Sequence, residues 1–202
     1  MCAVIDHNRP PMSSPLIHSV PRTAGGFTLI ELMVTVALLA IGLALGTPYI
    51  QDAVMNVLMT GQANDLMADL ALARSEAVKR NVTVALCTTT NGSTCGGGTW
   101  ADGWLVFPDL NGNGTQDTAT ELALKSRGKL DGNNSVEVCG DIGGGPRYLP
   151  YKPSGTSGAG IVNLVICDTR TTDLNGRSID ITNTGRANVT RVTCPMTPDC
   201  TP

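Results

Sequence analysis

Charged and aromatic residues are scarce in this sequence of 202 residues. Asp, Glu, Lys and Arg make up 15%, against a usual share of about a quarter, and Phe, Trp and Tyr make up 3%. The formal charge of -3 excludes a bulk positive field for nucleic acid, so any such binding must be local. An apolar content of 42% excludes long disorder, and 23 glycines with 12 prolines favour a turn-rich β fold over a helical bundle.

Histidine occurs only at His7 and His18, before a hydrophobic segment and within a stretch that we expect to be removed. Without imidazole, the mature chain has no Ser-His-Asp or Cys-His nucleophile pair and no His-ligated zinc site. No other convergent acid, base and nucleophile set takes its place. We therefore expect a protein that is not an enzyme and that uses no catalytic metal or cofactor.

An uncharged run of 19 residues extends over 32–50. At 1.5 Å per residue, a helix of this length crosses most of the hydrocarbon core of a bilayer. Small residues at 24–26 precede the run instead of following it, which is the wrong order for an ordinary secretory cleavage site. A single carboxylate, Glu31, stands at the start of the run, where it is costly in lipid unless a cation pairs with it.

The heptapeptide Gly-Phe-Thr-Leu-Ile-Glu-Leu at 26–32, after a short basic leader and before an apolar helix, resembles the class III signal of type IV pilins and type II secretion pseudopilins. The resemblance implies that a prepilin peptidase cuts after Gly26 and methylates the new N-terminal residue, Phe27. It also implies that Glu31 pairs with the N-terminal amine of a neighbouring subunit during filament assembly. The chemistry agrees, because a carboxylate in lipid needs a cation and the new ammonium lies in the same layer.

Apolar residues continue at helical spacing beyond the membrane run, with charged residues such as Asp69 and Arg74 between them. This spacing predicts one helix from Phe27 to about Arg80, roughly 80 Å long. Such a helix is longer than a bilayer requires, so we expect its second half to pack against a globular head.

Gly42, Gly46 and Pro48 cluster in the middle of this helix. Proline removes a backbone donor and clashes with the preceding turn, so we expect the helix to bend or lose hydrogen bonds here on assembly. A tolerated proline of an ordinary membrane helix is the alternative.

Short β-prone runs separated by Gly, Asn, Asp and Pro follow from residue 81 onward. We expect strands at 82–87, 104–108, 122–125, 136–139, 161–167, 178–181 and 189–193. The segment 100–109, with Gly185 and Arg186, resembles the GspH/FimT-type pseudopilins and minor pilins. The expected fold is α+β: a long N-terminal helix, transmembrane in its first half, packed on a disulfide-stapled antiparallel β-rich head. The domains are then a leader at 1–26, the helix at 27–80 and the head at 81–202.

Cysteine numbers predict a disulfide framework. Removal of the leader leaves six: Cys87, Cys95, Cys139, Cys167, Cys194 and Cys200. An even number in a head beyond the membrane favours disulfides, and the lack of a CxxC pair disfavours zinc. Loop-closure entropy alone favours pairing Cys87 with Cys95 and Cys194 with Cys200, which leaves Cys139 with Cys167.

Residues 109–117 carry oxygen side chains at alternate positions with a glycine at the sixth, as a calcium loop does. The acid expected at the twelfth position falls one place late, at Glu121. We therefore expect an Asn-Gly β-turn, which uses the same residues for positive φ.

Four arginines gather near the C-terminus, interleaved with aspartates: Arg170, Arg177, Arg186 and Arg191. The plain interpretation is solvated charge on strands and loops. In FimT-like minor pilins a C-terminal Gly-Arg-x-Arg motif is associated with binding DNA for uptake, but here Asn188 replaces the second arginine. Arg186 and Arg191 are the candidates for weak DNA binding, and on a regular strand they would face opposite sides unless a turn or bulge intervenes.

These features predict a minor pilin or pseudopilin, a structural subunit of a type IV pilus placed at or near its tip. We expect one span in the inner membrane, a periplasmic head, and partners that are the prepilin peptidase and other pilins or pseudopilins contacted through the N-terminal helix. Two alternatives stay open: a pseudopilin of a type II secretion system, and a DNA-binding minor pilin for natural transformation.

Overall fold

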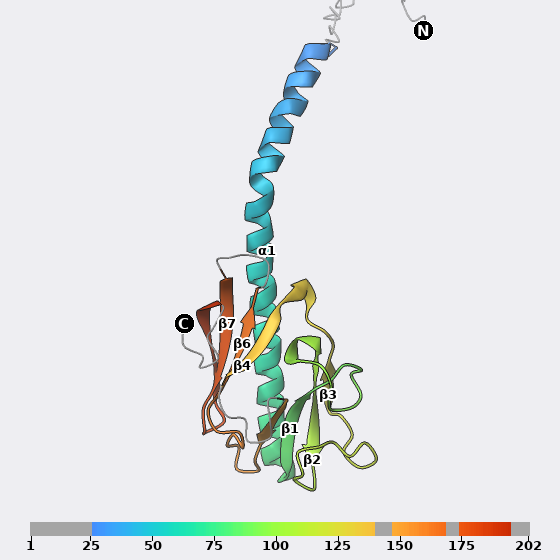
Figure 1. Ribbon diagram of the computed structural model, residues 1–202, viewed down its shortest axis with the longest axis vertical. Coiled ribbons are helices and arrows are strands. Elements are labelled where there is room, and N and C mark those ends of the chain that lie inside the picture. Colours follow the sequence, from blue (N-terminus) through green and yellow to red (C-terminus); the bar gives the residue numbers. More distant parts are fainter. Residues whose placement is uncertain (1–25, 140–146, 169–173, 195–202) are drawn as a thin grey trace, which may run out of the picture. The chain divides into compact units, whose positions relative to one another are not determined.

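The computed structural model describes residues 26–139, 147–168 and 174–194. They form one long helix, α1, followed by strands and two short 3-10 helices, η1 (Trp100–Asp102) and η2 (Asp131–Asn133) (Figure 1). The chain divides into two compact units, residues 1–45 and residues 46–202, and α1 belongs to both.

The helix α1 spans Leu29–Arg80, so the predicted helix begins two residues later than expected and ends where expected. Its first turn carries Glu31 and its last turn carries Lys79 and Arg80, charges that complement the helix dipole at each end. Asn81 follows with a φ of 56°, a left-handed conformation that commonly ends helices.

The strands form two four-stranded antiparallel sheets (Figure 1). The first has the order β3-β2-β1-β5 and consists of β1 (Thr83–Thr88), β2 (Trp104–Asp109), β3 (Lys125–Arg127) and β5 (Tyr148–Tyr151). The second has the order β4-β6-β7-β8 and consists of β4 (Ser135–Cys139), β6 (Val162–Cys167), β7 (Leu174–Ile181) and β8 (Ala187–Cys194).

The core of the second unit lies between α1 and the two sheets. From the helix it takes side chains that recur every three or four residues and are at most 1% exposed: Met59, Ala63, Leu66, Leu70, Ala73 and Ala77. Leu86 of β1, Trp104 of β2 and Leu164 of β6 meet them in the same cluster. The predicted packing of the helix's second half against a β-rich head is therefore confirmed.

Two strand predictions differ from the structure. The polar strand β3 begins at Lys125, so the apolar run expected at 122–125 lies almost entirely before it, and Leu122 is 71% exposed. β5, which includes Pro150, was not among the predicted strands. It lies at the edge of its sheet, where a residue without an N–H is tolerated.

Candidate functional site

The motif at the start of α1 stands outside the helix. Gly26 and Phe27 precede the first turn and are exposed, Phe27 at 85%. Thr28 caps the helix, because its Oγ1 accepts a hydrogen bond from the backbone N–H of Glu31 at 3.2 Å. The bond between Gly26 and Phe27 is therefore accessible and free of helical structure.

The first unit exposes an apolar surface without interruption. Every described residue from Gly26 to Leu45 is exposed, with Leu29 at 77% and Leu39 at 64%. By length and composition, this part of α1 suffices to cross a membrane. Glu31 is the sole ionisable side chain of residues 26–45, and nothing in the described part of the chain bonds to its carboxylate. Such a surface requires lipid or protein around it, and in lipid a carboxylate is costly unless a cation pairs with it.

Gly42, Gly46 and Pro48 lie within continuous helix. The boundary between the two compact units falls inside this cluster, between Leu45 and Gly46. A Cβ built on Gly42 or Gly46 meets nothing within 4 Å, so packing inside the described chain does not require glycine there. The expected bend on assembly stays a prediction.

Two disulfides are described in the head. Cys87 pairs with Cys95, with Cα atoms 5.6 Å apart, as predicted. Cys167 pairs with Cys194, with Cα atoms 6.0 Å apart, so both other predicted pairs, Cys139 with Cys167 and Cys194 with Cys200, are wrong. Cys139 is also disulfide-bonded. Cys200 lies outside the described residues.

The register of the second sheet explains the unexpected disulfide. Cys167 ends β6 and Cys194 ends β8, with β7 between the two strands. Gly176 of β7 is the register partner of Cys167, and a Cβ there would lie 2.6 Å from Sγ of Cys194. Because Gly176 has no side chain, there is room for the sulfur of Cys194. The pairing of these cysteines is therefore determined by strand register and not by their closeness in the sequence.

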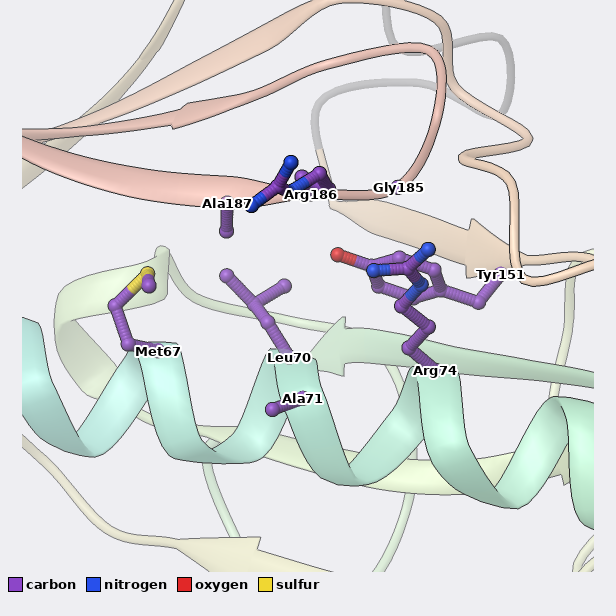
Figure 2. Close-up of a pocket in the computed structure, with 8 residues that line it drawn as sticks. All are labelled: Met67, Leu70, Ala71, Arg74, Tyr151, Gly185, Arg186 and Ala187. Carbon is purple, nitrogen blue, oxygen red and sulfur yellow. The ribbon is translucent and has the colours of Figure 1, made fainter.

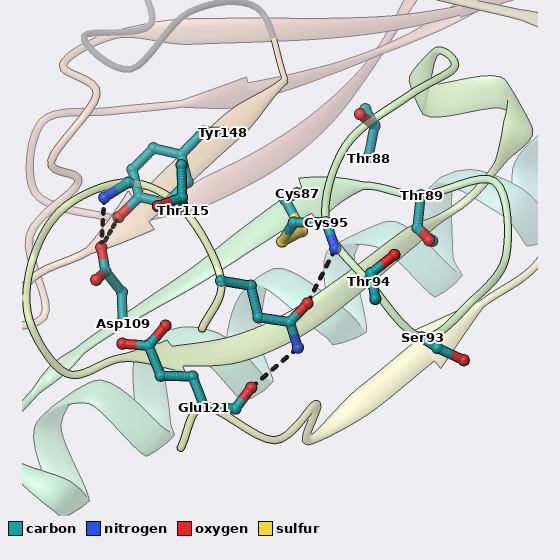
Figure 3. Close-up of a disulfide and its surroundings, with 12 residues drawn as sticks. Cys87, Thr88, Thr89, Ser93, Thr94, Cys95, Asp109, Thr115, Glu121 and Tyr148 are labelled. Carbon is teal, nitrogen blue, oxygen red and sulfur yellow. Dashed lines mark hydrogen bonds between the residues drawn. A yellow bond between two sulfur atoms is a disulfide. The ribbon is translucent and has the colours of Figure 1, made fainter. Parts of the chain in front are cut away.

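The loop after β2 is held by Asp109, which is 2% exposed (Figure 3). Its carboxylate accepts hydrogen bonds from the backbone N–H groups of Gly112 at 2.8 Å and of Asn113 and Gly114 at 3.2 Å, and from the Tyr148 hydroxyl. Burial, and next the bond to Asp109, raise the pKa of Tyr148 above its usual value.

Glu121 holds the other end of this loop. It is wholly buried and accepts the backbone N–H groups of Leu110 and Asp117 at 2.7 Å each. Gln116 joins the loop to the Cys87–Cys95 disulfide, because its Oε1 accepts the N–H of Cys95 at 2.9 Å (Figure 3). The acids of the calcium-like pattern therefore hold backbone amides, and no cluster of three or more His, Cys, Asp or Glu suited to a metal occurs among the described residues.

Gly185 and Arg186 lie in the turn between β7 and β8, beside α1 (Figure 2). Gly185 has a φ of 77°, and a Cβ there would lie 2.1 Å from the carbonyl oxygen of Gly155, so another residue would be strained and crowded. Arg74 of α1 joins the helix to two turns. Its side chain donates hydrogen bonds to the carbonyl oxygen of Gly155 at 2.9 Å and to that of Thr184, in the turn between β7 and β8, at 3.1 Å.

Arg74, Gly185 and Arg186 line a pocket of about 190 Å³ that has Tyr151 at one side (Figure 2). Burial raises the pKa of Tyr151 to about 12, and the positive charge of Arg74 opposes that shift. Neither Arg74 nor Tyr151 was predicted to take part in a site. The signal for Arg74 was its position one residue after Ala73, at the edge of the helical face that carries the core.

Arg186 and Arg191 do not converge. β7 and β8 pair residue for residue from Ala187 to Cys194, without a bulge. Arg186 precedes this ladder and lines the pocket with Arg74, whereas Arg191 lies within β8, five positions later; both are exposed. Arg191 instead stands opposite Arg177, which is 7% exposed.

Asp69 joins α1 to the first sheet. It is fully buried, and its Oδ2 accepts a hydrogen bond from Nε1 of Trp104 at 2.9 Å. The ammonium of Lys125 forms an ion pair with its Oδ1, and Arg127 approaches Asp69 at 4.0 Å while pairing with Asp65 at 3.0 Å. Sequence analysis placed Asp69 among the polar positions, and the missed signal was its place directly before Leu70 of the core.

Comparison with known proteins gives two family matches. Residues 62–185, well over half of the chain, match the family described as Type II transport protein GspH, and residues 21–47 match the Prokaryotic N-terminal methylation motif. The Pilin-like protein PilA1 of Thermus thermophilus is 31% identical over 139 residues, which cover 65% of this chain and 82% of PilA1.

Two crystal structures of the type IV minor pilin FimU from Pseudomonas aeruginosa (strain PAO1) are also similar. Their TM-scores are 0.48 and 0.49 at 20% and 19% identity, over 65% of this chain and 91% and 87% of the FimU chains. The family assignment depends on the sequence matches, which include both the head and the start of α1. The chain therefore belongs to the GspH family and is a type IV pilin-like minor pilin or pseudopilin.

Proposed function

We propose that this chain is a structural subunit of a type IV pilus that is built into the filament at or near its tip. The observation that supports the proposal is the exposed apolar surface of residues 26–45 with the lone carboxylate of Glu31. Lipid covers this surface before assembly, and the helices of neighbouring subunits cover it afterwards. The placement at the tip rests on the resemblance to minor pilins.

Processing by the prepilin peptidase prepares the subunit for assembly. Cleavage between Gly26 and Phe27 creates an ammonium group at the start of the apolar segment, and Glu31 of an adjacent subunit supplies its counter-ion. The helix holds the chain in the inner membrane as a single span, and the head lies in the periplasm. The disulfides of the head suit an oxidising compartment of this kind.

A pseudopilin of a type II secretion system is the second candidate, and the match to the Type II transport protein GspH favours it. Both functions use the same helix and the same processing. DNA uptake has less support, because Arg186 lies in the turn before β8 and Arg191 lies five positions later within the strand. Removal of residues 1–26 also takes away two basic residues and one acid, which changes the formal charge from -3 to -4.

The decisive variant is Glu31→Val in the full chain. We expect normal retention in the membrane, because the helix becomes more apolar, and a loss of about tenfold or more in co-purification with other pilins. Identification of the co-purifying subunits separates a pilus from a secretion system. Glu137→Val removes an exposed carboxylate of β4 and serves as the control. Undiminished co-assembly of Glu31→Val would contradict the proposal.

Intact-mass analysis of membrane-extracted protein tests the processing step. The expected species begins at a methylated Phe27. A dominant species that retains residues 13–26 would show that the chain is not processed at this bond.

A further inference from the structure

Arg177 of β7 is 7% exposed, yet it forms no ion pair with any carboxylate in the described ranges. Its Nη1 donates to the carbonyl oxygen of Gly176 at 3.0 Å, and its Nη2 donates to Oγ1 of Thr60 at 3.3 Å. The Thr60 hydroxyl gives its proton to the carbonyl oxygen of Asn56 at 2.8 Å, so it can only accept from Arg177. These bonds hold the guanidinium in one orientation without neutralising its charge.

A second arginine adds to this charge. Arg191 of β8 is the direct register partner of Arg177, and it too lacks an ion pair with any residue that the structure describes. Like charges directly opposite each other on neighbouring strands are destabilising. Burial, and next the charge of Arg191, lower the pKa of Arg177. Among the residues that the structure describes this arrangement is unfavourable, and an anion between the two arginines would reverse the sign of the interaction.

The two arginines face a pocket of about 440 Å³ between α1 and the end of the second sheet. The helix lines it with Asn56, Val57, Thr60, Gly61 and Asn64. The amides of Asn56 and Asn64 are further donors for an anion. A Cβ built on Gly61 meets nothing within 4 Å, so this wall leaves room for a side chain from outside.

The surroundings of the pocket favour a protein as the source of the anion. Val57 is 74% exposed and Val54, one turn earlier on the helix, is 58% exposed, so an apolar surface adjoins the arginines. A charged centre beside exposed aliphatic side chains is typical of a protein interface. A nucleic acid would need a row of cations along its phosphates, whereas the pocket has two arginines and the mature chain is negative overall.

We propose that Arg177 and Arg191 receive the carboxylate of an acidic side chain from another pilin-like subunit, whose apolar neighbours cover Val54 and Val57. The inference rests on the proposed role as a filament subunit and adds a docking site in the head to the helix contact at Glu31. Arg177 is fixed in place by Thr60, and the exposed Arg191 completes the contact.

The test places a photo-cross-linking amino acid at Val57 of the full chain, in cells that assemble the filament. We expect cross-linked peptides that come from another pilin-like subunit and contain Asp or Glu. Arg191→Glu should reduce the yield by about tenfold or more, because it sets two negative charges against each other. Lys152→Glu makes the same charge change at an exposed position outside the pocket and should leave the yield unchanged. Restoration of the yield by an acid-to-arginine change in the partner peptide would confirm the pairing.

The outcomes separate this inference from the proposed function. Retention of the Cys167–Cys194 disulfide and of tryptophan fluorescence verifies that Arg191→Glu is folded. If the chain still co-purifies with pilins while Arg191→Glu leaves the cross-link unchanged, the docking site is wrong and the proposed function stands. Cross-links to nucleic acid, to peptides of this chain itself or to peptides without an acid also overturn the docking site. If the unmodified chain fails to co-purify with any pilin, both proposals fail.

Discussion

The two parts of α1 differ in apolar content and in environment, since 14 of the 17 residues at 29–45 are apolar against 18 of the 35 at 46–80. Apart from Glu31 and Thr35, residues 29–45 carry no polar side chain and every one is exposed, whereas Met59, Leu66 and Leu70 are at most 1% exposed. In the second part the buried apolar residues form a stripe along one face of the helix, and charged residues lie between them in the sequence. Three of the buried positions are alanine. A helix that is apolar all round packs well in lipid or among other helices. A helix with one apolar stripe packs with that face against a sheet and keeps its other face in water. The difference shows that the share of apolar residues in a helix and their distribution around it together indicate what the helix packs against.

The carboxylates of the same two parts show a parallel difference. Asp69 is buried and has Trp104 and Lys125 as partners, while Glu31 is exposed and has no side-chain partner within the described chain. Asp69 therefore stabilises the fold, and Glu31 is available to a second molecule.

The largest effect on stability is expected from Asp69→Leu. The change leaves the indole N–H of Trp104 without its acceptor and Lys125 without its counter-ion, and breaking a buried pair costs about 3–5 kcal/mol. Denaturant unfolding of the detergent-solubilised chain measures it. Tryptophan fluorescence reports on the head alone, since both tryptophans, Trp100 and Trp104, lie in its core.

Asp65→Ala is the matched control for Asp69→Leu. The Asp65 side chain is 48% exposed and pairs with Arg127 at the surface, so its removal should cost at most about 1 kcal/mol. Equal losses for the two variants would show that Asp69 has no special role in joining the helix to the sheet.

The disulfides should follow next in size. Removal of Cys167–Cys194, with a sequence separation of 27, should cost about 3.5 kcal/mol by the chain-entropy relation, and removal of Cys87–Cys95, with a separation of 8, about 2.5 kcal/mol. Double Cys→Ser variants compared by tryptophan fluorescence give both values. Since both disulfides belong to the head, neither removal should release the chain from the membrane, and release would break the comparison between the two units.

A smaller effect is expected at alkaline pH from Tyr151. Burial raises its folded pKa to about 12, so below pH 10 both states hold the proton and the full stability is present. Above about pH 10 the unfolded state loses the proton first, and by about pH 11 the contribution of Tyr151 to the free energy of unfolding should fall by roughly 1.4 kcal/mol, in addition to any loss from Tyr148. Unfolding curves at increasing pH measure this loss. Tyr151→Phe should show a smaller decline, and an unchanged decline would exclude the tyrosine as its source.

Most of the fold could be predicted from the sequence because its signals are local. The helix follows from continuous apolar spacing, and the strands β1, β2 and β6 follow from short apolar runs between turns. β5 was not predicted: it is a short strand at the edge of its sheet, and Pro150 weakens its strand signal in the sequence. β3 is a polar edge strand, so the neighbouring apolar run gave a misplaced prediction.

The arrangement of the side chains was less predictable, because it depends on register. Cys87 and Cys95 are close in the chain, and loop closure identifies that pair. Cys167 and Cys194 lie on β6 and β8, with β7 between them. They can meet because Gly176 of β7, the register partner of Cys167, has no side chain to block the sulfur of Cys194. Arg177 and Arg191 are 14 positions apart in sequence, and only the β7–β8 ladder places them opposite each other.

The smallest effect is expected from Leu39→Ala in the first unit. Leu39 is 64% exposed, so its removal creates no cavity, and the unfolding of the head should change by less than about 0.5 kcal/mol. Leu70→Ala makes the same change at a side chain that is 1% exposed and should cost about 2–5 kcal/mol. Denaturant unfolding followed by tryptophan fluorescence compares the two. If Leu39→Ala destabilised the head as much as Leu70→Ala, the first part of α1 would be part of the folded core, and its apolar surface would no longer be available to lipid or to another subunit.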